Sequence, residues 1–317
     1  MRSWHDLRLS NLSNRKIPKS ALCLLCIAKD ELYFLPFFLG HYRKLGVRHF
    51  IFLDDNSTDG SIEYLLGQPD VTLLQSNFAF NDEIDGLRFG VAIRGKLSKQ
   101  LFPETWSLIA DADEFWFPPQ GLESLSATVR MLAKDGHRIC KGIMFDCFPR
   151  ALSDIDSATK KDSPFRLNPF TDSLGKIVWN NTSEPERLKY ENNVRNRLFI
   201  SLQEDGLVTD DFVRARGIPN LYKVPLIRWA KSISLVSAHR LNSSYTDTPI
   251  MKCAHYKFFP GWHLKVKAAL ASGAYYNNSV EYKFLRLLDK HRKNQILLSN
   301  STVNAESFFS FLNFSDK

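Results

Sequence analysis

The sequence has no long hydrophobic run, and that absence sets the first bound on what the protein is. Its 317 residues contain no stretch of about 18 or more apolar residues, so no membrane-spanning helix is predicted. Internal repeats, low-complexity tracts and a glycine-rich phosphate loop are also missing. The nearest candidate for such a loop, Gly95-Lys96-Leu97, lacks the hydroxyl residue that follows the lysine of a P-loop. Integral membrane proteins, repeat proteins and P-loop NTPases are therefore disfavoured.

Cysteine is scarce, with five residues in the chain. Cys23 and Cys26 form a Cys-x-x-Cys inside an apolar run at 21–28 that we interpret as a strand, since no small-residue cleavage site follows it. An offset of three puts two strand residues on opposite faces, so neither a redox pair nor a zinc pair is expected. The other three are scattered, at Cys140, Cys147 and Cys253. This odd, dispersed set favours a reduced, cytoplasmic compartment.

Positive charge exceeds negative charge, with 42 Lys and Arg against 34 Asp and Glu, for a net charge of +8. This excess suits an anionic ligand or an anionic membrane surface, and charge alone does not choose between them. Peripheral contact with the inner face of the membrane is therefore one expectation. No nucleic-acid partner is expected.

Apolar runs alternate with helical periodicity through the first half of the chain. Strands are expected at 21–28, 49–53, 71–74, 106–110 and 139–148, and helices at 35–45, 61–66, 87–101 and 122–133. Strands that alternate with helices in this way are typical of a doubly wound, mostly parallel sheet. The fold class is therefore predicted to be α/β.

The second half has a different character. The segment 149–191 is rich in Pro, Asn, Asp and Ser with little periodicity, and we expect a long irregular, functional or mobile loop. Beyond it, strands are expected at 194–200, 221–227 and 233–236, and helices at 262–273, 279–290 and 305–314. We therefore expect a polar arm at 1–20, a main domain at 21–260 with halves at 21–148 and 149–260, and a helical extension at 261–317.

Three carboxylates follow the apolar run that begins at Trp106, namely Asp111, Asp113 and Glu114. In open α/β sheets, ligands bind outside the carboxyl ends of the strands. On an extended chain Asp111 and Asp113 face the same way, and two carboxylates aimed at one point require a cation or a proton between them. Mg²⁺ takes one or two such carboxylates and completes its shell with water and phosphate oxygens. The stretch indicates a metal–diphosphate site; the alternative is a solvated acidic turn.

A second acidic turn, Asp54-Asp55-Asn56-Ser57-Thr58-Asp59-Gly60, directly follows the apolar strand at 49–53. Asp59 is placed to cap the next helix. Asp54 or Asp55 could accept a hydrogen bond from a ribose hydroxyl or a base N–H, and the alternative is that these side chains only shape the turn.

These two motifs, in this order and each at a strand end, resemble the family 2 glycosyltransferases and their relatives with the GT-A fold. The stretch 28–46 is similar to the Asn-Glu…His-Tyr…Leu-Gly opening of the bacterial branch, with Asp30 at the usual Asn. The resemblance extends to about residue 290 through Asn193–Phe199, Lys223–Trp229, His239 and His255–Phe258. It implies a GT-A domain with a mostly parallel central sheet flanked by helices, followed by a helical C-terminal tail.

The resemblance also implies roles for individual residues. The nucleotide-sugar would be contacted by Ala28, Lys29, Glu31, Asp54, Asp55, Arg195, Arg197 and Lys257, and Mn²⁺ or Mg²⁺ would be held by Asp111, Asp113 and His255. The arginines, taken alone, could equally lie on a solvated strand face. An inverting transfer needs a carboxylate to take the acceptor proton, and Glu114 and Asp146 are the candidates, each with a structural alternative. The role of His239 stays open.

The expected function is metal-dependent, inverting transfer of a sugar from a nucleotide-sugar to a bacterial surface glycan or a lipid-linked acceptor, in polysaccharide biosynthesis. One alternative is a nucleotidyltransferase or phosphohydrolase that uses the paired aspartates. A non-enzymatic alternative is a catalytically inactive glycan-binding protein on the same fold. The sequence does not set the donor sugar, the base, the linkage or the oligomeric state.

Overall fold

The chain folds as two compact units, each described here by itself. The computed structural model describes residues 3–18, 22–173, 178–179, 188–189, 193–212, 221–242, 248–273 and 276–309. Unit 1 consists of residues 1–143 and 222–253, and unit 2 of residues 144–221 and 254–317. The sequence-based division placed all of 149–260 in one half, whereas in the structure 222–253 return to the unit built by the beginning of the chain.

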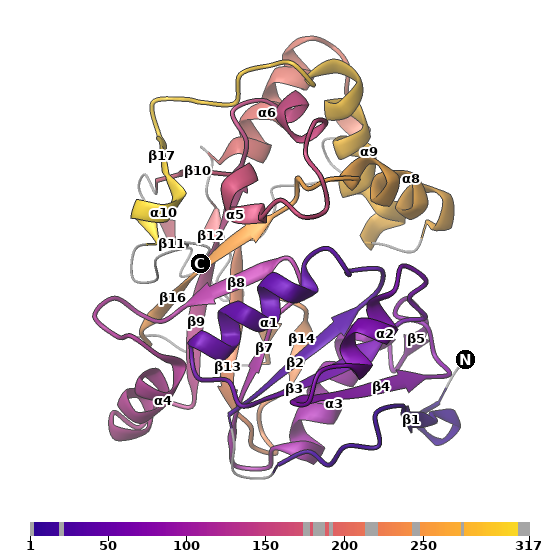
Figure 1. Ribbon diagram of the computed structural model, residues 1–317, viewed down its shortest axis with the longest axis vertical. Helices are drawn as coiled ribbons and strands as arrows, with labels where there is room; N and C mark the ends of the chain where they lie inside the picture. Colours follow the sequence, from indigo (N-terminus) through magenta and orange to yellow (C-terminus); the bar gives the residue numbers. More distant parts are fainter. Residues whose placement is uncertain are drawn as a thin grey trace. The chain divides into compact units, whose positions relative to one another are not determined.

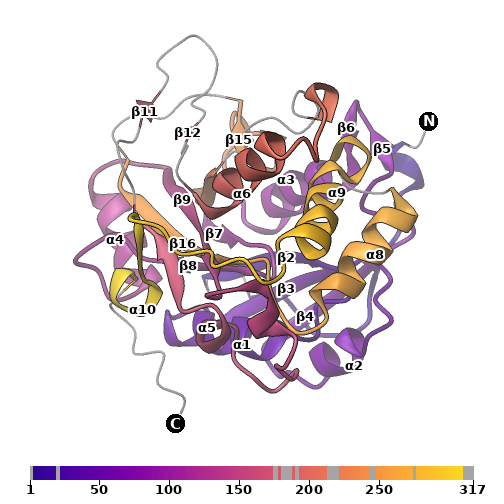
Figure 2. The ribbon, with the colours of Figure 1, turned by 90° about the horizontal axis from the view of Figure 1, so that it is seen from above.

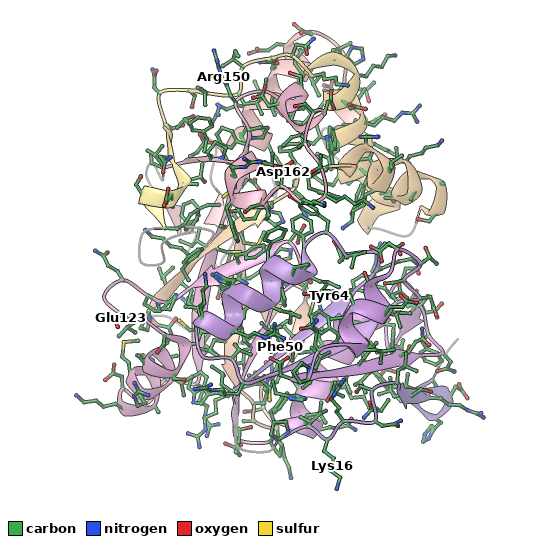
Figure 3. The ribbon with its side chains drawn as sticks, in the orientation of Figure 1. Lys16, Phe50, Tyr64, Glu123, Arg150 and Asp162 are labelled. Carbon is green, nitrogen blue, oxygen red and sulfur yellow. The ribbon has the colours of Figure 1, made fainter. Side chains whose placement is uncertain are left out.

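A block of four parallel strands forms the centre of unit 1. It consists of β2 (Cys23–Ala28), β3 (His49–Asp54), β4 (Val71–Ser76) and β7 (Trp106–Ile109), in the order β4-β3-β2-β7. The strands are apolar along most of their length because helices cover both faces of such a block. Figure 3 shows Phe50 of β3 among these strands, whereas exposed Lys16 points away from them.

Several other strand pairs of this sheet are antiparallel. In unit 1, β1 (Leu9–Asn11) pairs with β4, and β13 (Tyr222–Arg228) pairs with β7 and with β9 (Ile139–Phe148). The α/β class is therefore confirmed, with the four central strands forming a parallel part of the sheet. The first twenty residues, expected as an arm, include a strand of the sheet.

The helices of unit 1 lie on both faces of the parallel block. Its helices are α1 (Leu35–Lys44), α2 (Ser61–Leu66), α3 (Phe89–Leu101) and α4 (Leu125–Lys134). Figure 2 shows α1 and α2 on one side of β2, β3 and β4, and α3 on the other. This follows from right-handed crossovers, because α1 and α2 lead from β2 to β4 in one direction while α3 leads back past β2 to β7. All four helices were predicted.

The shorter elements of unit 1 connect these parts. They are η1 (Trp4–Asp6), β5 (Glu83–Ile84), β6 (Leu87–Arg88), β8 (Glu114–Phe117), β14 (Leu235–Ser237) and β15 (Arg240–Leu241), and β16 (Ile250–Tyr256) continues into unit 2. Strand β8, which directly follows the acidic turn, was not predicted as a separate element. None of the five cysteines forms a disulfide, and all are buried in described parts of the chain. Among the described residues, no helix has the length and apolar character needed to cross a membrane.

Unit 2 has its own apolar core between helices α6 (Val194–Glu204), α8 (Trp262–Ser272) and α9 (Tyr276–His291). Figure 1 shows α8 beside α9, and the core includes Leu198, Leu202, Trp262 and Phe284. Strand β10 (Phe170–Asp172) pairs antiparallel with β9 and with β17 (Thr302–Asn304), and α10 (Ala305–Phe308) follows. Helices α8 and α9 were predicted; half of the helix expected at 305–314 lies outside the described residues.

The segment 149–191 was expected to be irregular. Its described part contains η2 (Leu152–Ile155), α5 (Pro164–Leu167) and β10, and β11 (Val178–Trp179) pairs with β12 (Leu188–Lys189). Residues 174–177, 180–187 and 190–192 lie outside the described residues, so the mobile or functional loop expected there stays a prediction.

The strand predicted at 194–200 is wrong, because these residues open helix α6. The side chain of Asn193 accepts a hydrogen bond from the backbone N–H of Asn196 at 3.0 Å, which caps the helix. Val194, Leu198 and Leu202 are buried at a spacing of four residues, a helical period that the short apolar–polar alternation concealed. Arg195 and Arg197 therefore do not share one face of a strand.

Two glycines offer a test of the packing in unit 1. A methyl group at Gly142 of β9 would overlap the ring of fully buried Trp116, so Gly142→Ala should destabilise the protein by about 2–3 kcal/mol. Gly40 lies inside α1 with open space around its Cα, so Gly40→Ala should instead stabilise by about 0.5–1 kcal/mol. Urea denaturation of the two variants checks this, and shifts of the same sign would contradict the packing described.

Candidate functional site

The two acidic turns leave the same edge of the parallel block. Strand β2 lies between β3 and β7, with Ala28 opposite Asp54 in the register. On its other side, the backbone N–H of Ala110 donates to the carbonyl of Leu25 at 3.3 Å. The turn at 54–55 and the turn at 111–113 therefore flank the end of β2, about two strand spacings or roughly 10 Å apart. The common edge agrees with the sequence pattern, and the expectation that both turns line one pocket stays a prediction.

Asp54 and Asp55 have different surroundings. Buried Asp54 accepts hydrogen bonds from the backbone N–H of Ser57 at 3.1 Å and from Gln75 Nε2 at 3.3 Å, so it shapes the turn. Asp55 Oδ1 accepts from the backbone N–H of Phe80 at 3.0 Å, while its Oδ2 lies 3.8 Å from Lys29 Nζ. Burial raises the pKa of the Asp55 carboxyl group. Of the two, Asp55 has the carboxylate oxygen that is less engaged.

The loop after β2 is tied to the 54–60 loop through Asp30. Its backbone has a φ of 53°, in the left-handed region that Asp and Asn tolerate best among non-glycine residues. Its N–H donates to Ser57 Oγ at 2.9 Å, and its Oδ1 accepts from the Thr58 N–H at 2.6 Å. An asparagine at this position could adopt the same φ and form the same two hydrogen bonds. The departure from the family pattern at this position therefore leaves the loop geometry intact.

The other residues of this loop frame the same edge. Ala28 ends β2 and is buried, and the Lys29 side chain after it is about half exposed (48%). The Glu31 N–H donates to Ser61 Oγ at 3.1 Å, and its carbonyl accepts from the first turn of α1. Asp59 accepts from the N–H groups of Leu32 and Ser61 and so ties the two loops together, whereas the N-cap of α2 is Gly60 and not Asp59 as predicted.

The second acidic turn forms a cluster of four charged side chains. Asp111 Oδ1 pairs with Arg94 of α3, and Asp111 Oδ2 accepts from Lys223 Nζ of β13 at 2.8 Å. The same ammonium group pairs with Glu114 Oε1, while Glu114 Oε2 accepts from the Asp111 N–H at 3.2 Å. Arg94, Glu114 and Lys223 are buried, and the Asp111 side chain is about one-third exposed (32%). Two positive and two negative groups make this charged cluster neutral.

The carboxylates keep both cations protonated. Burial by itself would lower the pKa of Lys223, but the charges of Asp111 and Glu114 outweigh it and raise that pKa. The pKa of Arg94 is also raised, because the same two carboxylates more than offset its burial. The charged cluster therefore contains an ammonium and a guanidinium at neutral pH.

The charged cluster borders a small hollow that opens to solvent. The space in it that a water molecule can enter is about 10 Å³, and its wall includes Arg94, Asp111, Glu114, Lys223 and Leu235. Arg94 Nε is buried and has no hydrogen-bond partner among the described residues. A buried donor without a partner is rare in folded proteins and calls for an explanation.

The charged cluster does not fit a divalent cation at Asp111. Each carboxylate oxygen of that residue already has a cationic partner, so an ion would have to displace Arg94 or Lys223. Its charge would also be repelled by whichever cation stayed. Asp113, the second expected ligand, is buried in the turn between β7 and β8. His255, the third, belongs to unit 2.

Neither Arg94, Lys223 nor His239 was assigned a role by sequence reasoning. A signal for Lys223 was present, since a lysine inside an apolar strand needs a carboxylate partner. His239 Nδ1 lies 2.9 Å from the carbonyl oxygen of Tyr222. Because a carbonyl only accepts, Nδ1 carries the proton. Burial, together with the charge of Lys223, lowers the pKa of His239 to about 3, so the imidazole is neutral.

Asp146 lies in a separate charged network in unit 2. Its Oδ2 accepts from Arg195 Nε at 2.6 Å, and its Oδ1 lies 2.7 Å from His255 Nδ1. Arg195 also contacts Glu281 at 3.0 Å. Burial would raise the pKa of Asp146, but Arg195 and His255 outweigh it and hold that pKa well below its usual range. A carboxylate in this state is a weak proton acceptor, so the geometry argues against Asp146 as the base.

Arg197 and Lys257 are the other residues of unit 2 that were expected to bind the nucleotide-sugar. Arg197 pairs with Asp172 at 2.7 Å and donates to the carbonyl of Leu297 at 2.9 Å. Lys257 is half-buried just after β16. The two arginines thus hold unit 2 together, and their expected role as a diphosphate clamp stays a prediction.

Comparison with known proteins adds little to this geometry. No family model matches the chain, and no curated protein matches it. One similar solved structure is described as the crystal structure of 4-diphosphocytidyl-2C-methyl-D-erythritol synthase. The two chains are 13% identical, the match covers 63% of this chain and 86% of that chain, and the TM-score is 0.24. A likeness at that score carries no argument about function.

The Asp146 network generates a stability prediction. Asp146→Asn leaves the buried guanidinium of Arg195 without its main counter-charge, so the variant should lose about 3 kcal/mol or more of unfolding free energy. Asp70→Asn is a matched control, because Asp70 pairs with Arg43 near the surface and should cost about 1 kcal/mol or less. Urea denaturation at neutral pH measures both, and equal losses would contradict the difference in burial.

The difference in unfolding free energy between the parent protein and Asp146→Asn should depend on pH. The native pKa of Asp146 is lowered, so its contribution to stability is complete above its unfolded pKa of about 4 and is lost as pH falls from there towards the native pKa. The difference between parent and Asp146→Asn should therefore shrink between neutral pH and about pH 3. A difference that stays constant over this range would exclude a lowered pKa.

Proposed function

We propose that this protein transfers a sugar from a nucleotide-sugar donor and releases a nucleoside diphosphate. The observation that carries the proposal is the position of the two acidic turns, which flank one strand at the carboxyl edge of a parallel block. Ligands of open α/β sheets bind at that edge. A donor lying across the end of β2 would place its nucleoside at the 54–55 turn and its diphosphate at the 111–113 turn.

The nucleoside side of the proposed site rests on Asp55 and Lys29. Asp55 Oδ2 is 3.8 Å from Lys29 Nζ, too far for a hydrogen bond, so this oxygen can accept from a base N–H or a ribose hydroxyl. Its partial burial strengthens such a bond, because less water competes for it. Asp54 contributes indirectly, by holding the turn that presents Asp55.

The diphosphate side of the proposed site rests on the charged cluster. In the transfer, an acceptor hydroxyl oxygen bonds to the anomeric carbon while the bond from that carbon to the diphosphate oxygen breaks. The nucleoside diphosphate leaves with the electron pair, and the hydroxyl proton passes to a base. Positive groups fixed beside the leaving oxygen stabilise the charge that develops there. Arg94 and Lys223 are the buried cations at this edge that can do so.

The acceptor and the stereochemistry rest on the family resemblance alone. That resemblance favours inversion and a surface glycan or lipid-linked acceptor. Glu114, one expected base, has both carboxylate oxygens engaged, one by Lys223 and the other by the Asp111 N–H. A nucleotidyltransferase or phosphohydrolase on the same site would release pyrophosphate or inorganic phosphate instead.

A panel of nucleotide-sugars, assayed for nucleoside diphosphate, pyrophosphate and phosphate, tests the proposal. We expect nucleoside diphosphate to be the product, and Asp55→Ala to lower kcat/KM for the donor about tenfold to a hundredfold, the effect of losing one hydrogen bond to a charged group. Asp70→Asn is the control, since Asp70 precedes β4 at the opposite edge of the sheet. Release of pyrophosphate or phosphate, or equal kinetics for parent and Asp55→Ala, would reject the assignment.

A further inference from the structure

The point where the sequence predicted a metal ion holds a lysine side chain. Lys223 Nζ lies 2.8 Å from Asp111 Oδ2 and also pairs with Glu114 Oε1. Two carboxylates that converge on one point need a cation between them, and the ammonium group meets this need without a metal. Lys223 reaches the carboxylates from β13, whose Leu226 lies opposite Leu108 of β7 in the register.

The charged cluster has the same net charge as the metal site that the sequence predicted. A divalent cation with two carboxylates is neutral, and so is the set of Arg94, Lys223, Asp111 and Glu114. Asp113, the remaining carboxylate of the turn, is also buried and is not counted in this set of four. A divalent ion added to this neutral set would raise its charge by two while two buried cations stay beside it, which is electrostatically unfavourable.

Both cations retain donors that their carboxylate partners do not use. An ammonium group has three N–H donors, and Lys223 has two carboxylate partners among the described residues, which leaves a third donor. Arg94 Nε is likewise without a partner among the described residues. Both side chains are at least nine-tenths buried and border the same hollow. These unused donors, on two cations held in place by burial, suit an anionic group that enters the hollow.

We propose that Lys223, together with Arg94, takes the place of the divalent cation, and that the protein binds the diphosphate of its donor without a metal ion. The identity of the anion as a diphosphate rests on the proposed function. The occupation of the cation position by Lys223 does not, and it can be tested with metal alone.

In the first experiment, Mn²⁺ is titrated into the parent protein and into Asp111→Asn, and calorimetry measures the binding. The expected result is that the parent has no Mn²⁺ site that depends on Asp111. In Lys223→Met, Asp111 and Glu114 face each other without the ammonium group, so this variant should gain a Mn²⁺ site and its Tm should rise with Mn²⁺. Lys99→Met is the matched control; Lys99 also lies at this side of α3, where its ammonium donates to Ser234 Oγ at 2.8 Å, and it should gain nothing.

The metal titration has clear contrary outcomes. A Mn²⁺ site in the parent that disappears in Asp111→Asn would overturn the proposal, as would a folded Lys223→Met that gains no site. If Lys223→Met does not fold, the comparison of the parent with Asp111→Asn still decides whether the cation position is open to a metal.

The second experiment measures binding of UDP, GDP, CDP and ADP to the parent in excess EDTA and in Mn²⁺. We expect at least one nucleotide to bind with the same Kd in both, and Lys223→Met to weaken it about tenfold to a hundredfold in EDTA. Binding that EDTA abolishes and Mn²⁺ restores would overturn the metal-free proposal and leave the proposed function standing. Binding of none of the four would count against the proposed function and the diphosphate part of this inference, while the metal titration still decides the cation position.

Discussion

The pairing of buried Glu114 and partly exposed Asp111 with the one lysine Lys223 is the interaction that links the two distant segments of unit 1. Asp111 and Glu114 cannot lie at the end of β7 without a compensating cation, and the chain supplies it from a strand 112 residues later in the sequence. The return of residues 222–253 to the first unit brings this lysine to the acidic turn. Strand β13 lies antiparallel beside β7, with its Leu226 opposite Leu108, and Lys223, beyond it on the same strand, reaches the acidic turn.

Much of the parallel block could be predicted from the sequence, because its information is local. Strands such as Cys23–Ala28 are apolar along their whole length, and the acidic turns follow them directly. The edge on which both turns lie then follows from the parallel arrangement alone. Helix α6 could not be predicted in the same way, since Val194–Ile200 satisfies a period of two almost as well as a helical period. The N-cap at Asn193 distinguishes a helix from a strand here, but its role is recognised only when a helix is assumed to begin at Val194.

The charged cluster could not be predicted from short stretches of sequence, for a different reason. An Asp-x-Asp-Glu turn shows that a cation is needed but not which cation, because a metal ion and a lysine satisfy the same electrostatic requirement. Identifying Lys223 needs the pairing of β13 with β7, a contact between segments that are far apart in the sequence. Arg94 is closer in sequence, on α3, yet as one of several basic residues in that helix it has no distinguishing pattern.

The state of the two expected bases constrains how a transfer at this site would proceed. Glu114 has one oxygen on Lys223 and the other on a backbone N–H, and Asp146 is held between Arg195 and His255 with a lowered pKa. The contacts of Asp146 stabilise its ionised form and so weaken this carboxylate as a proton acceptor. If neither takes the proton early, the reaction must gain most from stabilising the leaving diphosphate. Under the proposed function, the buried cations Arg94 and Lys223, with their unused donors, would provide that stabilisation at the leaving oxygen.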